Sequence, residues 1–208
     1  MTDKNGVGVT VISHDSENRT LVDGCDPAGC YSRDIHYTGA SLSQLASLTD
    51  VSSHCEQFIK YECFHSVLRF PADYLIGWWV SRDSKIMTFW EGASPNSTIC
   101  ACDRDNSCVG GKRCNCDQND EEWREDSGLL TDKSTLPVKE LRFGDVDSFD
   151  RHDEKGYHTL GKFKCYGPGE DEIGSTWTSK GFRSLPLSAV ENFLYYFLFF
   201  FYLFCYFF

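Results

Sequence analysis

Five cysteines gather between positions 100 and 116, where the chain reads CACDRDNSCVGGKRCNC. Two Cys-x-Cys pairs, Cys100 with Cys102 and Cys114 with Cys116, flank Cys108, which lies midway between them. Thiols at this density either form disulfides in an oxidising compartment or bind a metal ion as thiolates. Four thiolates could close a tetrahedral zinc site, but the usual two-residue spacer is missing and the stretch contains no histidine. The pattern therefore favours disulfides, and an intracellular zinc site is the alternative.

The spacing suggests one connectivity without determining it. If residues 100–116 form a hairpin, Cys100 opposes Cys116 and Cys102 opposes Cys114, and both pairs project from the same face. Cys108 would then lie at the tip and could pair elsewhere. A non-hairpin pairing is also open.

The other cysteines extend this disulfide framework. Cys55 and Cys63 lie on one predicted strand, roughly 26 Å apart at about 3.3 Å per residue. A disulfide needs Cα atoms within about 7 Å, so unless the chain turns between them, each pairs with a distant cysteine such as Cys108 or Cys165. Cys25 and Cys30 bracket the turn sequence DPAG and could close a small local loop. The cysteines expected in disulfides are Cys25, Cys30, Cys55, Cys63, Cys100, Cys102, Cys108, Cys114, Cys116 and Cys165, which leaves Cys205 unpaired.

Two further groups of residues could do chemistry. Asp145, Asp147 and Asp150, in GDVDSFD, offer the hard oxygen ligands that suit Ca²⁺, although a solvated turn is the competing interpretation. His14 beside Asp15 resembles a catalytic pair, but the chain lacks a nucleophile motif such as G-x-S-x-G. We therefore expect His14 to be a surface histidine, and the protein to be no enzyme and to have no catalytic residues.

Composition points to the secretory route. The 208 residues carry a formal net charge of −11, which argues against nucleic-acid binding because phosphates require a basic surface. Two N-x-S/T sequons, at Asn18 and Asn96, predict glycosylation alongside the disulfides. The start MTDKNGVGVT has no apolar region and is not a signal peptide, so the chain is expected to be a fragment of a longer protein.

The hydrophobic pattern predicts the elements that position these residues. Within CEQFIKYEC, Gln57, Ile59 and Tyr61 share parity with Cys55 and Cys63, which indicates one buried face. Trp78, Trp79, Trp90 and Trp123 are expected in the core rather than stacked on sugars. Strands are expected at 7–13, 30–38, 55–63 and 138–143, a hairpin at 77–92, a helix capped by Ser41 at 41–50, a helical turn at 121–126 and a last ordered segment at 157–166.

Several stretches carry a resemblance to a known family. They are VTVISHDSENRT, LSQLASLTDVSSHCEQFIKYEC, GWWVSRDSKIMTFWEG, CACDRDNSC, CNCDQNDEEWREDSGLLTDKSTLPV, LRFGDVD and TLGKFKC. The most specific are CAC…CNCD followed by W-R-x-D-x-G-x-L, and P-V followed by GDxD. On these residues the chain resembles the fibrinogen-like region of the contactin-associated proteins, which are neurexin-related adhesion receptors.

The resemblance implies an α+β, disulfide-rich, fibrinogen C-terminal-like domain over residues 7–166, truncated at its N-terminus because the usual Tyr-Cys-Asp segment is missing. It implies an extracellular recognition module, on the outer side of the plasma membrane or anchored to it, that binds other cell-surface or matrix proteins. No cofactor is implied beyond a possible Ca²⁺ at Asp145, Asp147 and Asp150. Flanking laminin-G and EGF-like modules are absent from the chain. The alternative is a Ca²⁺-dependent fibrinogen-related lectin that binds acetylated glycans.

The end of the chain differs from this domain. Residues 167–192 are rich in Gly, Ser, Pro and Glu and are expected to be a linker. Residues 193–208, FLYYFLFFFYLFCYFF, are all apolar and span roughly 24 Å as a helix, short of the bilayer core of about 30 Å. Their T-rich codons favour translation of a non-coding stretch over a genuine membrane tail. If expressed, this aromatic tail would contact membranes or aggregate.

Overall fold

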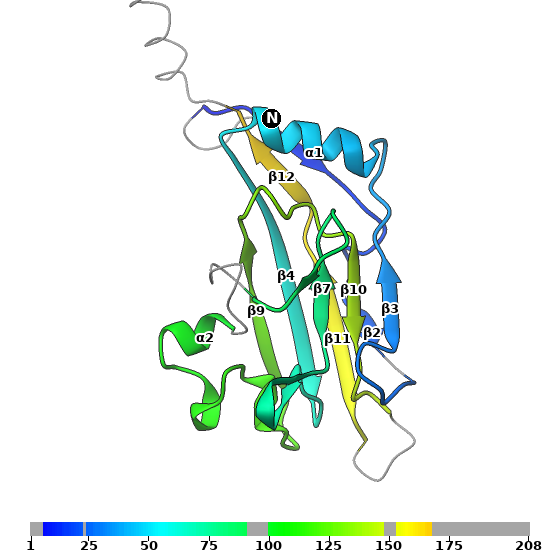
Figure 1. Ribbon diagram of the computed structural model, residues 1–208, viewed down its shortest axis with the longest axis vertical. Helices are drawn as coiled ribbons and strands as arrows, with labels where there is room; N and C mark the ends of the chain where they lie inside the picture. Colours follow the sequence, from blue (N-terminus) through cyan, green and yellow to red (C-terminus); the bar gives the residue numbers. More distant parts are fainter. Residues whose placement is uncertain (1–5, 23, 91–99, 148–152, 168–208) are drawn as a thin grey trace, which may run out of the picture. The chain divides into compact units, whose positions relative to one another are not determined.

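The described part of the chain is built on two larger antiparallel sheets, and the helix α1 lies at one end of them (Figure 1). The computed structural model describes residues 6–22, 24–90, 100–147 and 153–167, and Met1–Gly169 forms one compact unit. Strands predominate and ten cysteines form five disulfides, which confirms the predicted disulfide-rich, mostly stranded domain.

The larger sheet is built around one long central strand, β4. Its strand order is β1-β12-β4-β11-β2, and β9 pairs with the other edge of β4. The register along β4 shifts by one residue between the pairs Leu160–Ile59 and Lys164–Glu56. β11 and β12 are therefore one strand interrupted by a bulge at Gly161, whose N–H donates to the carbonyl of Phe58 at 2.7 Å. The strands are β1 (Val9–Ile12), β2 (Thr20–Val22), β4 (His54–Phe64), β9 (Arg124–Leu130), β11 (Lys155–Leu160) and β12 (Phe163–Tyr166).

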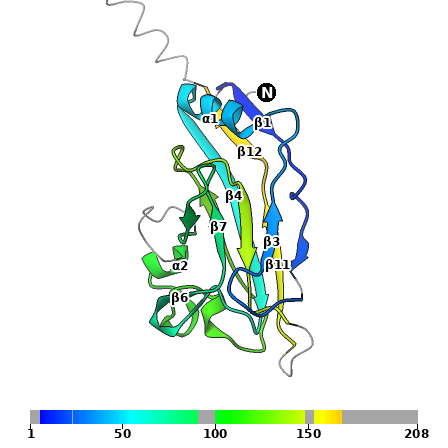
Figure 2. The same cartoon turned by 45° about the vertical axis from the view of Figure 1, so that its right-hand side comes forward.

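The smaller sheet lies across one face of the larger one, as both views of the chain show (Figure 2). Its order is β3-β10-β7-β8, and the β7–β8 pair confirms the predicted hairpin. The strands are β3 (Tyr31–Asp34), β7 (Trp78–Val80), β8 (Ile86–Met87) and β10 (Glu140–Phe143). A separate two-stranded pair joins β5 (Arg69–Phe70) to β6 (Tyr74–Leu75) around a 3₁₀ turn at Pro71–Asp73.

The core fills the space between the two sheets. The burial of β4 alternates along its length, as the sequence predicted, so Tyr61 faces inward and its ring stacks on Phe143 with centroids 4.3 Å apart. The Tyr31 hydroxyl lies 2.9 Å from Nε2 of His158, so it links the sheets through a polar contact. The largest fully buried side chains are Trp79, Trp90, Tyr61, Phe143, Phe163, Leu45, Ile59, Leu68, Leu130, Leu136, Leu141 and Leu160.

The predicted helix is confirmed as α1 (Leu42–Val51). Ser41 and Gln44 form a reciprocal capping box, in which the Ser41 hydroxyl accepts from the Gln44 N–H and Gln44 Oε1 accepts from the Ser41 N–H. This satisfies two N–H groups that the first turn would otherwise leave unpaired. Leu45 packs inward from the helix.

Two of the predicted secondary-structure elements are wrong. The helical turn predicted at 121–126 is absent, because β9 begins at Arg124 and pairs along seven residues of β4. The hairpin predicted at 100–116 is replaced by a short helix, α2 (Ala101–Arg104), and 3₁₀ turns at Val109–Gly111 and Cys116–Gln118. In both places long-range contacts with the sheet override a weak local preference.

Candidate functional site

The cysteine-rich loop is held by a connectivity that spacing did not reveal. Cys100 pairs with Cys114 and Cys102 with Cys108, while Cys116 pairs with Cys63 on β4. The pairs Cys100–Cys116 and Cys102–Cys114 expected of a hairpin are therefore wrong. The loop is instead anchored near the end of β4, the central strand of the larger sheet.

The two remaining disulfides agree with the pairings expected from the sequence. One closes a local loop, and the other joins β4 to a distant cysteine. Cys25 and Cys30 close the small loop around DPAG. Cys55 pairs with Cys165, its register partner on β12, and their Cα atoms lie 4.1 Å apart. These sulfurs are bonded to each other, so none of the ten is a thiolate available to zinc.

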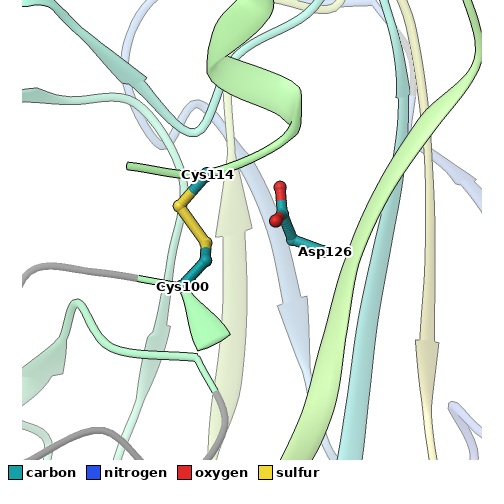
Figure 3. Close-up of side chains that lie close together, drawn as sticks. All are labelled: Cys100, Cys114 and Asp126. Carbon is teal, nitrogen blue, oxygen red and sulfur yellow. A yellow bond between two sulfur atoms is a disulfide. The ribbon is translucent and has the colours of Figure 1, made fainter. Parts of the chain in front are cut away.

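Asp126, on β9, lies beside the Cys100–Cys114 disulfide of the cysteine-rich loop (Figure 3). Its Oδ1 accepts the N–H of Asn115 and its Oδ2 accepts the N–H of Cys116, each at 2.9 Å. Burial raises the pKa of Asp126 to about 6, although both backbone N–H groups oppose that rise. Asp126 also lies beside Cys100 and Cys114, but the disulfide between these two cysteines leaves no metal-binding thiolate. The carboxylate is therefore a structural acceptor, and it is the Asp of the W-R-x-D motif.

Of the three predicted calcium residues, Asp145 lies in a group of carboxylates that the sequence did not define. Oδ2 of buried Asp145 accepts the Val67 N–H at 2.9 Å, and its carboxylate lies within 4.8 Å of Asp26 and Glu154. Burial raises the pKa of Asp145 and of Glu154. The negative charge of Asp26 raises the pKa of Asp145 further, and the negative charge of Asp145 does the same to Glu154. The Asp147 N–H donates to Oε2 of Glu154 at 3.5 Å, and Asp150 lies outside the described residues. A calcium site here stays a prediction, with Asp26 and Glu154 as added candidate ligands.

His14 and Asp15 do not form a pair. His14 is 7% exposed, which contradicts the expected surface position. Its Nε2 lies 2.9 Å from the Gly161 carbonyl, and its Nδ1 accepts the Ser16 N–H at 3.1 Å, so the ring supports the bulge. Asp15 instead contacts His36 at 3.0 Å and Arg33 at 3.2 Å.

His158 is the most deeply buried histidine of the described chain, with no exposed surface. It contacts Tyr31 through Nε2 and stacks near Phe143, with ring centroids 6.1 Å apart. Burial, and then the charge of Arg33, lowers the pKa of His158 from its ordinary 6.5 to about 4. The sequence pattern placed this histidine in the last ordered segment, 157–166, without assigning it a role.

We expect His158 to make folding sensitive to acid. The folded state binds this proton less readily than the unfolded chain, so stability falls as the pH drops from about 6.5 to about 4, by ~3 kcal/mol. Asp126 and Asp117 act in the opposite sense, because their raised pKa values favour folding at lower pH. The comparison must therefore be with His158→Gln, which does not titrate but can still bond Tyr31.

Urea unfolding of both proteins at several pH values measures this effect. The advantage of the wild type over His158→Gln should shrink by about 3 kcal/mol between pH 7 and pH 4. A difference that stays constant over this interval would show that the ring is not held neutral.

An aromatic platform lies on the outer face of the larger sheet, opposite the core. We use this name for Phe64, Trp123 and Tyr157 with Arg19, whose guanidinium carbon lies 3.3 Å from the Tyr157 ring centroid and 6.0 Å from that of Trp123. The Trp123 ring lies 5.5 Å from Phe64 and 5.7 Å from Tyr157. Trp123 is nevertheless 52% exposed, so its predicted place in the core is wrong.

The strand register explains how the platform is assembled. Leu21, Tyr157, Glu62 and Glu125 are cross-strand neighbours on β2, β11, β4 and β9 in turn, so they form one outward row. Trp123 precedes β9 and shares the parity of Glu125. The same face also carries Leu129, which is 40% exposed.

Charged side chains order the platform. Nε of Arg19 donates to both Glu62 carboxylate oxygens, at 3.1 and 3.0 Å. Lys60 lies 3.3 Å from Glu62 and 3.5 Å from Glu125. Arg19, Glu62, Trp123, Arg124 and Glu125 line a hollow of about 270 Å³. The arrangement places a flat apolar surface beside fixed donors and acceptors, which suits recognition.

Asn18 is exposed at the start of β2, beside the platform. The Thr20 hydroxyl of its sequon donates to the Asn18 carbonyl at 2.9 Å. Asn96 lies outside the described residues.

Secretion from a eukaryotic host is expected to add a glycan at Asn18. An amidase that removes N-linked glycans should then lower the mass of the peptide, and an unmodified peptide would contradict the expectation.

Within the stretches that the structure describes, no helix is both long enough and apolar enough to cross a membrane. The tail at 193–208 and the predicted linker at 167–192 lie outside those stretches, apart from Gly167. Their assignment as linker and tail stays a prediction.

Known proteins show what this chain is similar to. It is 32% identical over 177 residues to Contactin-associated protein 1 of Rattus norvegicus, a match covering 84% of this chain and 12% of that protein. It is 37% identical over 170 residues to Neurexin-4 of Drosophila melanogaster, covering 78% and 13%, respectively. The chain is homologous to a segment of these proteins. Contactin-associated protein 1 of Homo sapiens is 34% identical over 160 residues, which cover 76% of this chain and 11% of that relative. No model of a protein family matches.

These contactin-associated and neurexin relatives support the family named from the sequence motifs. The chain spans between 11% and 13% of their length, so the similarity concerns one segment of a much longer protein. The fibrinogen-like character of that segment stays a prediction.

Proposed function

We propose that the chain is an extracellular recognition module of a contactin-associated-protein-like cell-adhesion receptor, which binds protein partners at cell contacts. The observation that carries the proposal is the open outer face of the larger sheet, where Leu21, Trp123 and Leu129 are between 40% and 52% exposed. Exposed apolar side chains gathered on one face mark an interaction surface. The homologous relatives and the five disulfides support an adhesion role outside the cell.

The finer features of the proposal follow from the sequence resemblance. The module is fibrinogen-like, recognises partners without catalysis, and works on the outer side of the plasma membrane. Membrane contact through residues 193–208 is the alternative to the non-coding origin that their composition favours. The name of one relative states an association with contactin, so recombinant contactin is the first protein partner to test.

A binding assay with one variant pair tests the proposal. Leu129→Glu places a charge on the outer face of β9, and Ile86→Glu places one at a 58% exposed position of β8 in the other sheet. The full chain is immobilised and exposed to recombinant contactin and to cells. Leu129→Glu is expected to weaken binding at least tenfold, because a charge at a desolvated contact is costly, whereas Ile86→Glu should bind as the wild type does. Equal binding by both variants, or no binding to any cell surface, would contradict the proposal.

A second candidate function is a Ca²⁺-dependent lectin for acetylated glycans. It rests on the carboxylate group of Asp26, Asp145 and Glu154, whose oxygens converge within 4.8 Å. A glycan array run with calcium and with a chelator separates the two functions. Binding of acetylated sugars that disappears with the chelator and in Asp145→Asn would favour the lectin.

A further inference from the structure

We propose that the hollow beside Trp123 binds one neutral sugar ring of a glycan carried by the partner surface. This inference rests on the proposed recognition function and names a chemical class that the outer sheet face accepts. The site differs from the Asp26–Asp145–Glu154 group and needs no metal ion.

The exposed indole of Trp123 supplies the stacking surface. Phe64 and Tyr157 hold the ring from one side, with centroids 5.5 and 5.7 Å away, yet 52% of the residue stays exposed. The face of an aromatic ring carries negative charge density, which attracts the slightly positive C–H groups along one side of a pyranose. A flat sugar ring therefore fits the exposed part of the indole surface.

The charges around the hollow select a neutral ligand. Two carboxylates, from Glu62 and Glu125, and the guanidinium of Arg19 belong to residues of the lining, and the ammonium of Lys60 lies within 3.5 Å of both carboxylates. An anion or a cation would meet one repulsive group for each attractive one. A hydroxyl both donates and accepts hydrogen bonds, so a ring bearing several hydroxyls can pair with both kinds of group.

Competing occupants are less suited to the same place. A lysine or arginine of a protein partner would seek the face of Tyr157, but Arg19 already occupies it at 3.3 Å. A large apolar side chain would have to displace water from Glu62, whose carboxylate is ion-paired with Arg19 and is 18% exposed. The hollow of about 270 Å³ is small, near the lower limit for small-molecule sites, which fits one or two sugar rings better than an extended segment.

The network is also ordered before binding. Both oxygens of Glu62 accept from Nε of Arg19, and Lys60 lies within 3.5 Å of both Glu62 and Glu125. Pre-ordered side chains lose less conformational freedom when a ligand arrives, which favours a weak polar ligand such as a single sugar.

The direct test titrates the full chain with a panel of methyl glycosides in the presence of a chelator. Neutral hexosides, N-acetylhexosaminides, a sialoside and a sulfated hexoside are compared by saturation-transfer NMR and tryptophan fluorescence. We expect millimolar binding of at least one neutral glycoside that persists in the chelator. Trp123→Ala should reduce it more than tenfold, and Trp123→Phe less, because a phenyl ring keeps part of the stacking surface.

Two controls separate recognition from folding. Tyr74→Ala removes another exposed aromatic side chain, on β6, and should bind as the wild type does. Trp123→Ala should keep its unfolding midpoint close to that of the wild type, because its side chain is half exposed. Three results would overturn the inference: no neutral glycoside binds, Trp123→Ala binds undiminished, or the charged sugars bind more tightly than every neutral one.

A cell assay distinguishes failure of this inference from failure of the proposed function. Suppose that the wild type still binds partner cells after their glycans are removed, and that Trp123→Ala still fails to bind them. The platform then binds protein, and the sugar proposal is wrong. If neutral glycosides bind but no cell surface does, the adhesion function fails while the sugar site stands.

Discussion

Replacing Cys55 and Cys165 together by alanine is expected to lower the free energy of unfolding by about 5 kcal/mol, the largest effect of any disulfide here. The bond joins residues 110 positions apart, so it restricts the unfolded chain strongly. It also links β12 to β4 near the beginning of this central strand. Denaturant unfolding followed by tryptophan fluorescence measures the change.

The matched control is the Cys25–Cys30 bond, whose cysteines lie only 5 positions apart. Loop-closure entropy predicts a loss of about 2 kcal/mol for the corresponding double alanine variant. If the first variant does not fold, reduced recovery of folded protein relative to this control gives the same ranking. A larger loss for Cys25–Cys30 would contradict the assigned connectivity.

Asp126→Ala is expected to destabilise the fold by about 2–3 kcal/mol. The substitution leaves the N–H groups of Asn115 and Cys116 without their acceptor inside the protein. Removal of a buried negative charge offsets part of this cost, which is why the expected loss is smaller than two separate hydrogen bonds would suggest. Chemical denaturation at pH 7 reports the total.

Glu125→Ala is the matched control, because Glu125 is next to Asp126 and its side chain is 56% exposed. This substitution should change the free energy of unfolding by less than about 0.5 kcal/mol. Hydrogen exchange adds a local measurement. The amides of Asn115 and Cys116 should exchange faster in Asp126→Ala only. Unchanged protection of both amides would mean that the carboxylate does not hold the loop.

The two faces of the larger sheet have different roles. The inner face stabilises the fold, and the outer face is proposed to bind partners. The inner face carries Tyr61 and His158, which pack against the smaller sheet. The outer face carries Trp123 and Arg19, whose contacts leave them substantially exposed. Changes on the outer face can therefore alter binding with little loss of stability, which makes the variants of Trp123 and Leu129 informative.

The local sequence pattern was sufficient to predict several elements, because these elements depend on residues that are close together in the chain. Alternating apolar positions determine which face of β4 is buried, and Ser41 caps α1 with a residue three positions away. The turn between β7 and β8 likewise lies between two short apolar segments. The helical turn expected near Trp123 was wrong, because pairing of β9 with β4 outweighed local preference.

The sequence by itself determined that the cysteines serve disulfides, that β4 has a buried face, and that the motifs belong with the contactin-associated and neurexin relatives. Only the tertiary structure decided that Cys63 bonds Cys116, that Asp126 accepts two N–H groups of the loop, and that Trp123 lies outside the core. The physical reason is that these contacts depend on strand register between distant segments. A shift of one residue exchanges the two faces of a strand, and spacing along the chain does not encode that register.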